Sequence, residues 1–109
     1  MSGSDLFTGT LALLILRAVW SEPVHGYAIG RQLRVSSSGV LDVEEGVLYP
    51  ALHRLERQGL LSASWGRSDT GRKAKFYTIT DVGKKHLESE TERWSTYVEA
   101  VGRLLEAHG

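Results

Sequence analysis

The sequence predicts a mainly α-helical fold of the α+β class, with one β-hairpin and a long helix at its C-terminal end. Three observations indicate this: apolar residues recur at helical spacing in three segments before Gly59, β-forming residues flank a glycine-containing turn between residues 60 and 79, and no proline follows Pro50. A chain of 109 residues with 41% apolar content fills a single core, so we expect one compact domain with an appended helix.

Two helices are expected before residue 40. Asp5 or Thr8 can cap the first, and the run 21–23, which contains Pro23, ends it. Its apolar residues are Leu6, Leu13, Leu14, Leu16, Ala18 and Trp20. The second helix is short and stops at the serine- and glycine-rich run 36–39. Its apolar residues are Tyr27, Ile29, Leu33 and Val35.

A third helix is expected between Asp42 and Gly59. Asp42 stands three residues before Glu45, which is the spacing of a capping box, and Gly59 supplies the left-handed residue that commonly ends a helix. The apolar residues that we expect on its buried face are Val47, Leu48, Ala51, Leu52 and Leu55.

Beyond Gly59 the pattern becomes that of a β-hairpin, with strands at 60–65 and 76–79 and a basic tip between them. A last helix begins at Thr80 or Asp81 and runs almost to the end of the chain. Helix, helix, helix, hairpin, helix is the order of a winged helix-turn-helix domain with a C-terminal extension, whereas a three-helix bundle leaves the hairpin unexplained. We therefore expect a winged helix-turn-helix domain at 1–79 and a separate C-terminal helix at 80–109.

Composition restricts the classes of function. Lys and Arg together number 13, as do Asp and Glu, so the chain lacks the basic excess common in nucleic-acid-binding proteins. Its charge is nevertheless uneven, because residues 67–85 are mainly basic and residues 88–106 mainly acidic. The absence of cysteine excludes disulfides and thiolate metal sites, and the apolar run 11–20 is too short to cross a membrane. With no signal peptide discernible, we expect a cytoplasmic protein.

No catalytic centre emerges from the sequence. None of the four histidines, His25, His53, His86 and His108, stands at ligand spacing to a second histidine or shares a motif with a carboxylate. Gly66 and Gly71 have the spacing of a phosphate loop, but Arg72-Lys73 follows where Lys and then Ser or Thr are needed. We expect neither an enzyme nor a metal or other cofactor.

Two groups of side chains are candidates for DNA contact. Beyond its apolar face the third helix carries Tyr49, His53, Arg54 and Arg57, and the hairpin carries Arg67, Arg72, Lys73 and Lys75. A helix that reads a major groove needs such groups, and cations on a hairpin tip gain from counterion release at phosphates. Taken separately, each group is also compatible with an ordinary solvated surface.

The motifs resemble those of PadR-like transcriptional regulators. They are His25-Gly-Tyr27, then Gly-Val-Leu-Tyr-Pro-Ala-Leu-His-Arg-Leu-Glu at 46–56, Gly-Arg-Lys-Ala-Lys-Phe-Tyr at 71–77 and Thr-Asp-Val-Gly at 80–83. The resemblance implies a homodimer that binds double-stranded, palindromic operator DNA and commonly represses transcription. The residues expected to contact DNA are Tyr27, Tyr49, Pro50, His53, Arg54, Arg72, Lys73 and Lys75. The sequence departs from the family at Val47, often Ser or Thr, and at the carboxylates Glu44 and Glu45.

The last helix carries an apolar seam with alternating spacings of four and three residues, typical of a helix that pairs with another helix. The seam is Leu87, Thr91, Trp94, Val98, Val101, Leu105 and His108. We expect a homodimer interface at Leu87, Trp94, Val98, Val101 and Leu105, together with packing against the first helix of the same chain.

Trp94 stands in the middle of the seam, and the short PadR-like proteins have a hydrophobic cavity at the dimer centre. We therefore expect Trp94 to bind a small planar hydrophobic effector, with a role as core filler as the alternative. Trp65, at the end of the first hairpin strand, is expected to serve packing. The competing function is a winged-helix module that binds another protein and no operator.

Overall fold

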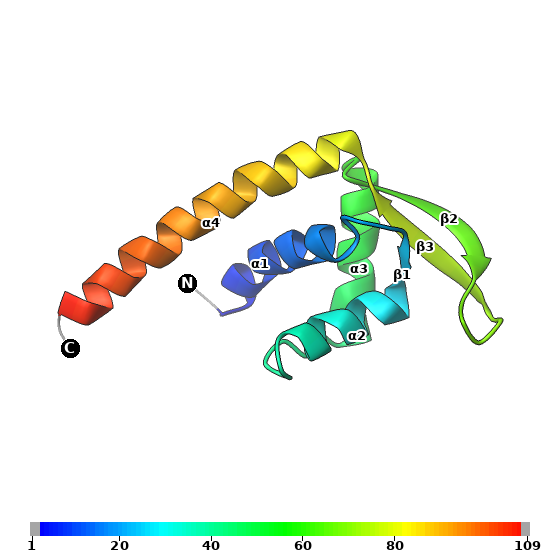
Figure 1. Cartoon of the computed structure of the whole chain (residues 1–109), viewed down its shortest axis with the longest axis horizontal. Helices are drawn as coiled ribbons and strands as arrows, with labels where there is room; N and C mark the ends of the chain where they lie inside the picture. Colours follow the sequence, from blue (N-terminus) through cyan, green and yellow to red (C-terminus); the bar gives the residue numbers. More distant parts are fainter. Residues whose placement is uncertain (1–2, 108–109) are drawn as a thin grey trace.

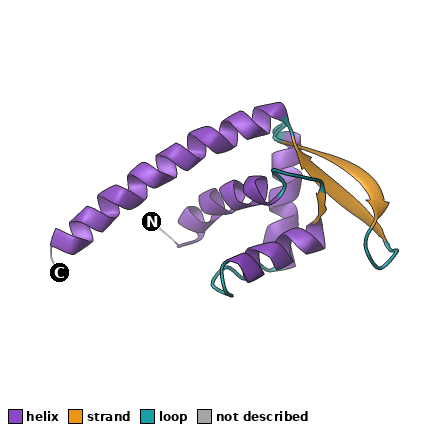
Figure 2. Cartoon of the chain, in the orientation of Figure 1, coloured by secondary structure: helices purple, strands orange, loops and turns teal. Residues whose placement is uncertain are grey.

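The computed structural model describes residues 3–107, with side chains from 10 to 106. Its elements are α1 (Gly3–Ala18), β1 (Val24–His25), α2 (Gly26–Ser36), α3 (Glu45–Arg57), β2 (Leu61–Arg67), β3 (Lys73–Ile79) and α4 (Asp81–Ala107) (Figure 1). The order of helices and hairpin is the predicted one, and the arrangement is a winged helix-turn-helix with a long C-terminal helix (Figure 2). Leu6 and His108 lie outside the described side chains.

One apolar core joins α1, α2, α3, the base of the hairpin and the start of α4. Its members are Leu11, Ile15, Leu16, Val19, Ile29, Leu33, Leu48, Ala51, Leu52, Leu55, Leu60, Leu61, Tyr77, Ile79 and Leu87. The predicted apolar faces of α2 and α3 supply most of what these two helices bury. Tyr27, Val35 and Val47 are corrections, because all three are exposed.

Three helix boundaries differ from the expected ones. α1 begins at Gly3, earlier than a cap at Asp5 or Thr8 allows, and it ends at Ala18 because the N–H of Trp20 donates to the carbonyl of Arg17 in a tighter turn. The expected capping box at Asp42 is wrong. Glu44 is the N-cap of α3, without a side-chain hydrogen bond, and its carbonyl accepts from Val47 and Leu48.

The C-terminal end of α3 is as predicted. Gly59 has φ +78°, its N–H donates to the carbonyl of Glu56, and the N–H of Leu60 donates to the carbonyl of Leu55. This is the double hydrogen bond of a Schellman motif, which turns the chain sharply from the helix into β2.

A third strand was not predicted. β1 pairs antiparallel with β3, with Val24 opposite Tyr77 and His25 opposite Phe76, so the sheet order is β1-β3-β2. Both hairpin strands are also longer than expected, reaching Arg67 and starting at Lys73. The short strand fixes the start of α2 to the sheet, and with it the spacing between α2 and the hairpin.

α4 leaves the core after its first turns. The Thr80 hydroxyl accepts from the N–H of Gly83 and donates to the carbonyl of Gly59, which fixes the start of the helix to the end of α3. A Cβ at Gly83 would overlap the carbonyl oxygen of Leu60. α4 then packs beside α1 and extends past it (Figure 1). The radius of gyration is 15.3 Å, against about 13 Å for a compact chain of this length.

Candidate nucleic-acid interface

The two sides of α3 differ sharply. Leu48, Ala51, Leu52 and Leu55 fill the core, while Pro50, His53 and Arg57 are exposed and Tyr49, Arg54 and Glu56 are half-buried. The spacing of 3.6 residues per turn puts Pro50, His53 and Arg57 on the side away from the core, while Tyr49 packs partly against the core at the edge of that side. The residues that sequence analysis assigned to DNA contact on this helix therefore lie on accessible surface.

Tyr49 bridges α3 and the start of α2. Its ring lies so close to Gly26 that a Cβ there would be 2.7 Å from the Tyr49 Cε1, which explains why glycine follows His25 in the first motif. Burial raises the pKa of the Tyr49 phenol, and the nearby Glu45 and Tyr77 raise it further. The hydroxyl thus stays protonated and available as a hydrogen-bond donor.

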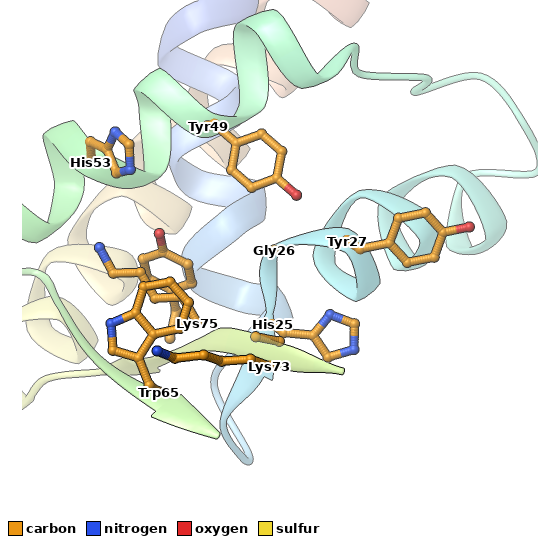
Figure 3. Close-up of a pocket in the computed structure, with 10 residues that line it drawn as sticks. His25, Gly26, Tyr27, Tyr49, His53, Trp65, Lys73 and Lys75 are labelled. Atoms are coloured by element: carbon orange, nitrogen blue, oxygen red, sulfur yellow. The ribbon is translucent and has the colours of Figure 1, made fainter. Parts of the chain in front are cut away.

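His25, the first residue of the first motif, has a structural role. It is the N-cap of α2, where its Nδ1 accepts a hydrogen bond from the N–H of Ala28 at 3.4 Å. Its ring meets the edge of Phe76 at 5.3 Å between centroids and stacks with Tyr27 at 6.5 Å. Tyr27, expected to contact DNA from α2, is exposed beside this cap, with its ring nearly parallel to that of His25 (Figure 3).

The hairpin, β2 and β3 with their turn, forms a wing whose one face changes character along its length. Alternate residues of a strand share a face, and the register pairs Leu61 with Ile79, Ala63 with Tyr77, Trp65 with Lys75 and Arg67 with Lys73. Leu61, Tyr77 and Ile79 at the base are buried, whereas Trp65, Arg67 and Lys73 toward the tip are exposed. The face that begins as core ends as a basic, aromatic surface.

The tip of the wing is a tight turn held by local hydrogen bonds. The N–H of Ser68 donates to the carbonyl of Arg72 at 2.8 Å, and Gly71 adopts φ +81°. The Arg67 guanidinium donates to the carbonyl of Gly71 at 2.9 Å. Arg72 is exposed.

Lys75 is engaged within the protomer. Its Nζ donates to the Glu56 carboxylate of α3 at 3.0 Å, and that hydrogen bond raises the pKa of Lys75. The same ammonium lies 5.5 Å from the centroid of the buried Tyr77 ring. This ion pair ties β3 to α3. Lys75 therefore differs from Lys73, which has the same charge but no such ion pair, although sequence analysis treated the two cations alike.

A cavity of about 340 Å³ lies between α2, α3 and the wing. Tyr49 and His53 line it from α3, and Trp65, Lys73 and Lys75 line it from the wing (Figure 3). The expected packing role of Trp65 is wrong, because its side chain is 64% exposed. The cavity joins the two groups of side chains that the sequence presented only separately.

The seam on α4 divides into a buried and an exposed part. Leu87 is 4% exposed and belongs to the protomer's own core, so little of its surface remains for a partner. Trp94 is 38% exposed, Val98 46% and Leu105 70%, while Val101 is half-buried. Trp94 lies beside Tyr97, with 6.0 Å between ring centroids. A contiguous apolar strip therefore remains uncovered from Trp94 onward.

Other classes of site are not evident in residues 3–107. Within this part of the chain no helix is long and apolar enough to cross a bilayer, and no three side chains of His, Cys, Asp or Glu gather as metal ligands would.

The fold and this surface define a winged helix-turn-helix protein with a basic wing. The family described as "Transcriptional regulator PadR-like family" matches residues 15–89. The chain therefore belongs to the PadR-like family of transcriptional regulators.

Solved structures of relatives support the assignment. A PadR family transcriptional regulator from Eggerthella lenta is 34% identical, with 94% of this chain and 87% of that chain covered and a TM-score of 0.79. A PadR-like transcriptional regulator from Bacillus cereus is 32% identical, with 93% and 96% covered and a TM-score of 0.79. A transcriptional regulator from Clostridium thermocellum reaches a TM-score of 0.82 at 25% identity, with 94% and 97% covered.

Proposed function

We propose that this PadR-like regulator is a repressor that binds a palindromic operator as a homodimer and releases it when a planar hydrophobic effector binds. The observation that carries the proposal is the shared cavity, which brings the accessible side of α3 and the cations of the wing to one surface. A reading helix needs cations beside it to hold the DNA backbone on either side of the groove it enters. Because the ligand is chromosomal DNA, we place the protein in the cytoplasm.

The side chains divide into two roles on DNA. His53 and Arg54, on the accessible side of α3, are positioned to reach base edges in a major groove. Pro50 packs at the groove wall. The hydroxyls of Tyr27 and Tyr49, with Arg72 and Lys73, contact phosphates and set the register of the helix. Lys75 reaches a phosphate only if it leaves Glu56.

The homodimer uses the exposed strip of α4. Trp94, Val98, Val101 and Leu105 pair with the same residues of a second protomer, which removes apolar surface from water at about 25 cal/mol per Å². To read two half-sites, the two-fold axis between the α4 helices has to put the two α3 helices on the same side of a duplex, about one helical turn of roughly 34 Å apart. That symmetry is the reason for a palindromic operator.

The effector site lies where the two Trp94 rings approach the two-fold axis. Two indoles cannot pack as closely as small residues, and flat apolar molecules stack well on indole. Release of DNA requires that the effector bind the DNA-free dimer more tightly than the DNA-bound dimer, typically by about 5- to 150-fold.

Selection of duplexes from a randomised library by the wild-type protein, followed by fluorescence anisotropy, tests the proposal. We expect an enriched inverted repeat, one dimer per duplex by sedimentation, and affinity that falls steeply with salt. Failure to enrich any duplex would instead favour a module that binds another protein. An enriched site without inverted symmetry would support DNA binding but contradict binding as a homodimer.

A further inference from the structure

The exposed indole of Trp65 is unusual for its place in the fold. It lies on the wing face that continues the core, opposite Lys75 in the register, yet it is 64% exposed. Burying such a ring against the base of the wing would be favourable by its area alone. The structure instead leaves the indole facing the cavity beside α3 (Figure 3).

Trp65 holds Lys73, a cation of the wing face for which the described part of the chain offers no carboxylate partner. The Lys73 ammonium lies 5.0 Å from the Trp65 ring centroid, within the range of a cation–π interaction, whereas the neighbouring Lys75 pairs with Glu56. A lysine side chain loses much rotamer freedom when it binds an anion. The indole restricts Lys73 in advance and so reduces the entropy lost on binding.

The two side chains together complement one unit of a nucleic-acid backbone. A flat apolar ring fits the apolar edge of a deoxyribose, and an ammonium beside it fits the adjoining phosphate. Tyr49 and His53 form the opposite wall of the cavity, so a backbone strand that passes between α3 and the wing meets both walls.

We propose that Trp65 contacts the DNA backbone directly, packs on a deoxyribose and positions Lys73 on the next phosphate. The inference rests on the proposed DNA binding. Trp65 is thus added to the residues that contact DNA. It contributes apolar contact and restricts the Lys73 side chain, but it contributes no charge.

Substitutions distinguish the contribution of the Trp65 ring to DNA affinity from that of the Lys73 charge. Trp65→Leu should weaken binding of a duplex selected by the wild-type protein by roughly threefold to tenfold, and Trp65→Phe by less, because phenylalanine keeps a weaker cation–π surface. The slope of log affinity against log salt should stay at the wild-type value in both, since no cation is lost. Lys73→Ala should flatten that slope by about one unit. Trp65→Leu with unchanged affinity would overturn the inference.

Fluorescence tests the contact itself. The tryptophan emission that the wild-type protein loses in Trp65→Phe is that of Trp65, and we expect the selected duplex to protect this component strongly from acrylamide quenching. Trp65→Phe retains Trp20 and Trp94, and the quenching of its emission should change little when the duplex is added. If the protein binds the duplex fully but acrylamide quenches Trp65 as strongly as without DNA, the proposed Trp65 contact is wrong while the proposed function stands. If the protein binds no duplex at all, both the contact and the proposed function are wrong.

Discussion

The wing and α4 both begin in the core and both leave it, but their outer ends differ in chemistry. Leu61, Tyr77 and Ile79 anchor the wing, and Gly83 and Leu87 anchor α4. Farther out, the wing presents an indole and cations, whereas α4 presents an apolar strip. A cationic end favours a polyanion and an apolar end favours another apolar surface. The inner ends therefore hold the fold, and the outer ends determine the partners.

The largest effect should come from the inner end of α4. Leu87→Ala removes a buried side chain and should lower the free energy of unfolding by about 2–5 kcal/mol, because Leu87 is 4% exposed within one protomer. Urea unfolding measures this loss, which should not depend on protein concentration.

Leu105→Ala is the matched control, since it makes the same change at a seam position of the same helix that is 70% exposed. Any loss that it causes should depend on protein concentration, as expected for a dimer contact. A loss for Leu87→Ala that disappears on concentrating the protein would place Leu87 in the dimer interface after all.

The outer end of α4 should govern assembly. Val98→Asp places like charges near the two-fold axis at a position 46% exposed in the protomer, so the fold should persist while the dimer dissociates. Sedimentation equilibrium should show monomers, and operator affinity should fall by more than tenfold because one half-site is lost. Thr96→Asp puts the same charge on the opposite side of the helix and should remain dimeric. A dimeric Val98→Asp protein would move the interface away from the seam.

The fold was predictable where the signal is local. The apolar spacing of α2 and α3, the glycine stop at Gly59 and the start of α4 depend on residues within one or two turns. β1 was missed because two residues carry no alternation, and the capping box failed because Asp42 lies two residues before the actual N-cap, Glu44.

The sequence predicted most residues of the candidate site, but it did not predict which of them contact one another. His53, Arg72 and Lys73 are exposed as expected, and Tyr49 is half-buried. The Lys75–Glu56 ion pair joins residues 19 positions apart, and the burial of Leu87 depends on where α4 crosses the core. Trp65 was assigned to packing from its place at the end of the first hairpin strand, and its exposure contradicts that assignment. The periodicity of a sequence indicates only local structure, so it does not predict such contacts between elements.

A smaller effect is expected at Trp94. Planar hydrophobic compounds should quench tryptophan emission of the wild-type dimer, and Trp94→Ala should remove most of the response, because the two indoles near the axis form the site. Trp65→Phe should leave effector binding intact. Titration of the compound into operator-bound protein should release DNA with a coupling of about 1–3 kcal/mol. Quenching that survives in Trp94→Ala would assign the site to another tryptophan.

The smallest and most discriminating effect separates Lys73 from Lys75 on the wing. Lys73→Ala should flatten the salt slope of operator binding by about one unit, since that ammonium has no carboxylate partner among the described side chains. Lys75→Ala should change the slope little, because Glu56 already neutralises the ammonium at 3.0 Å. Glu56→Gln frees Lys75 and should steepen the slope by up to about one unit, with tighter binding at low salt. The double variant Glu56→Gln/Lys75→Ala should return to the wild-type slope if Lys75 is the cation released. Equal flattening by Lys73→Ala and Lys75→Ala would mean that DNA displaces Glu56 from Lys75, and the inner limit of the DNA-binding surface would then lie one residue pair closer to the core.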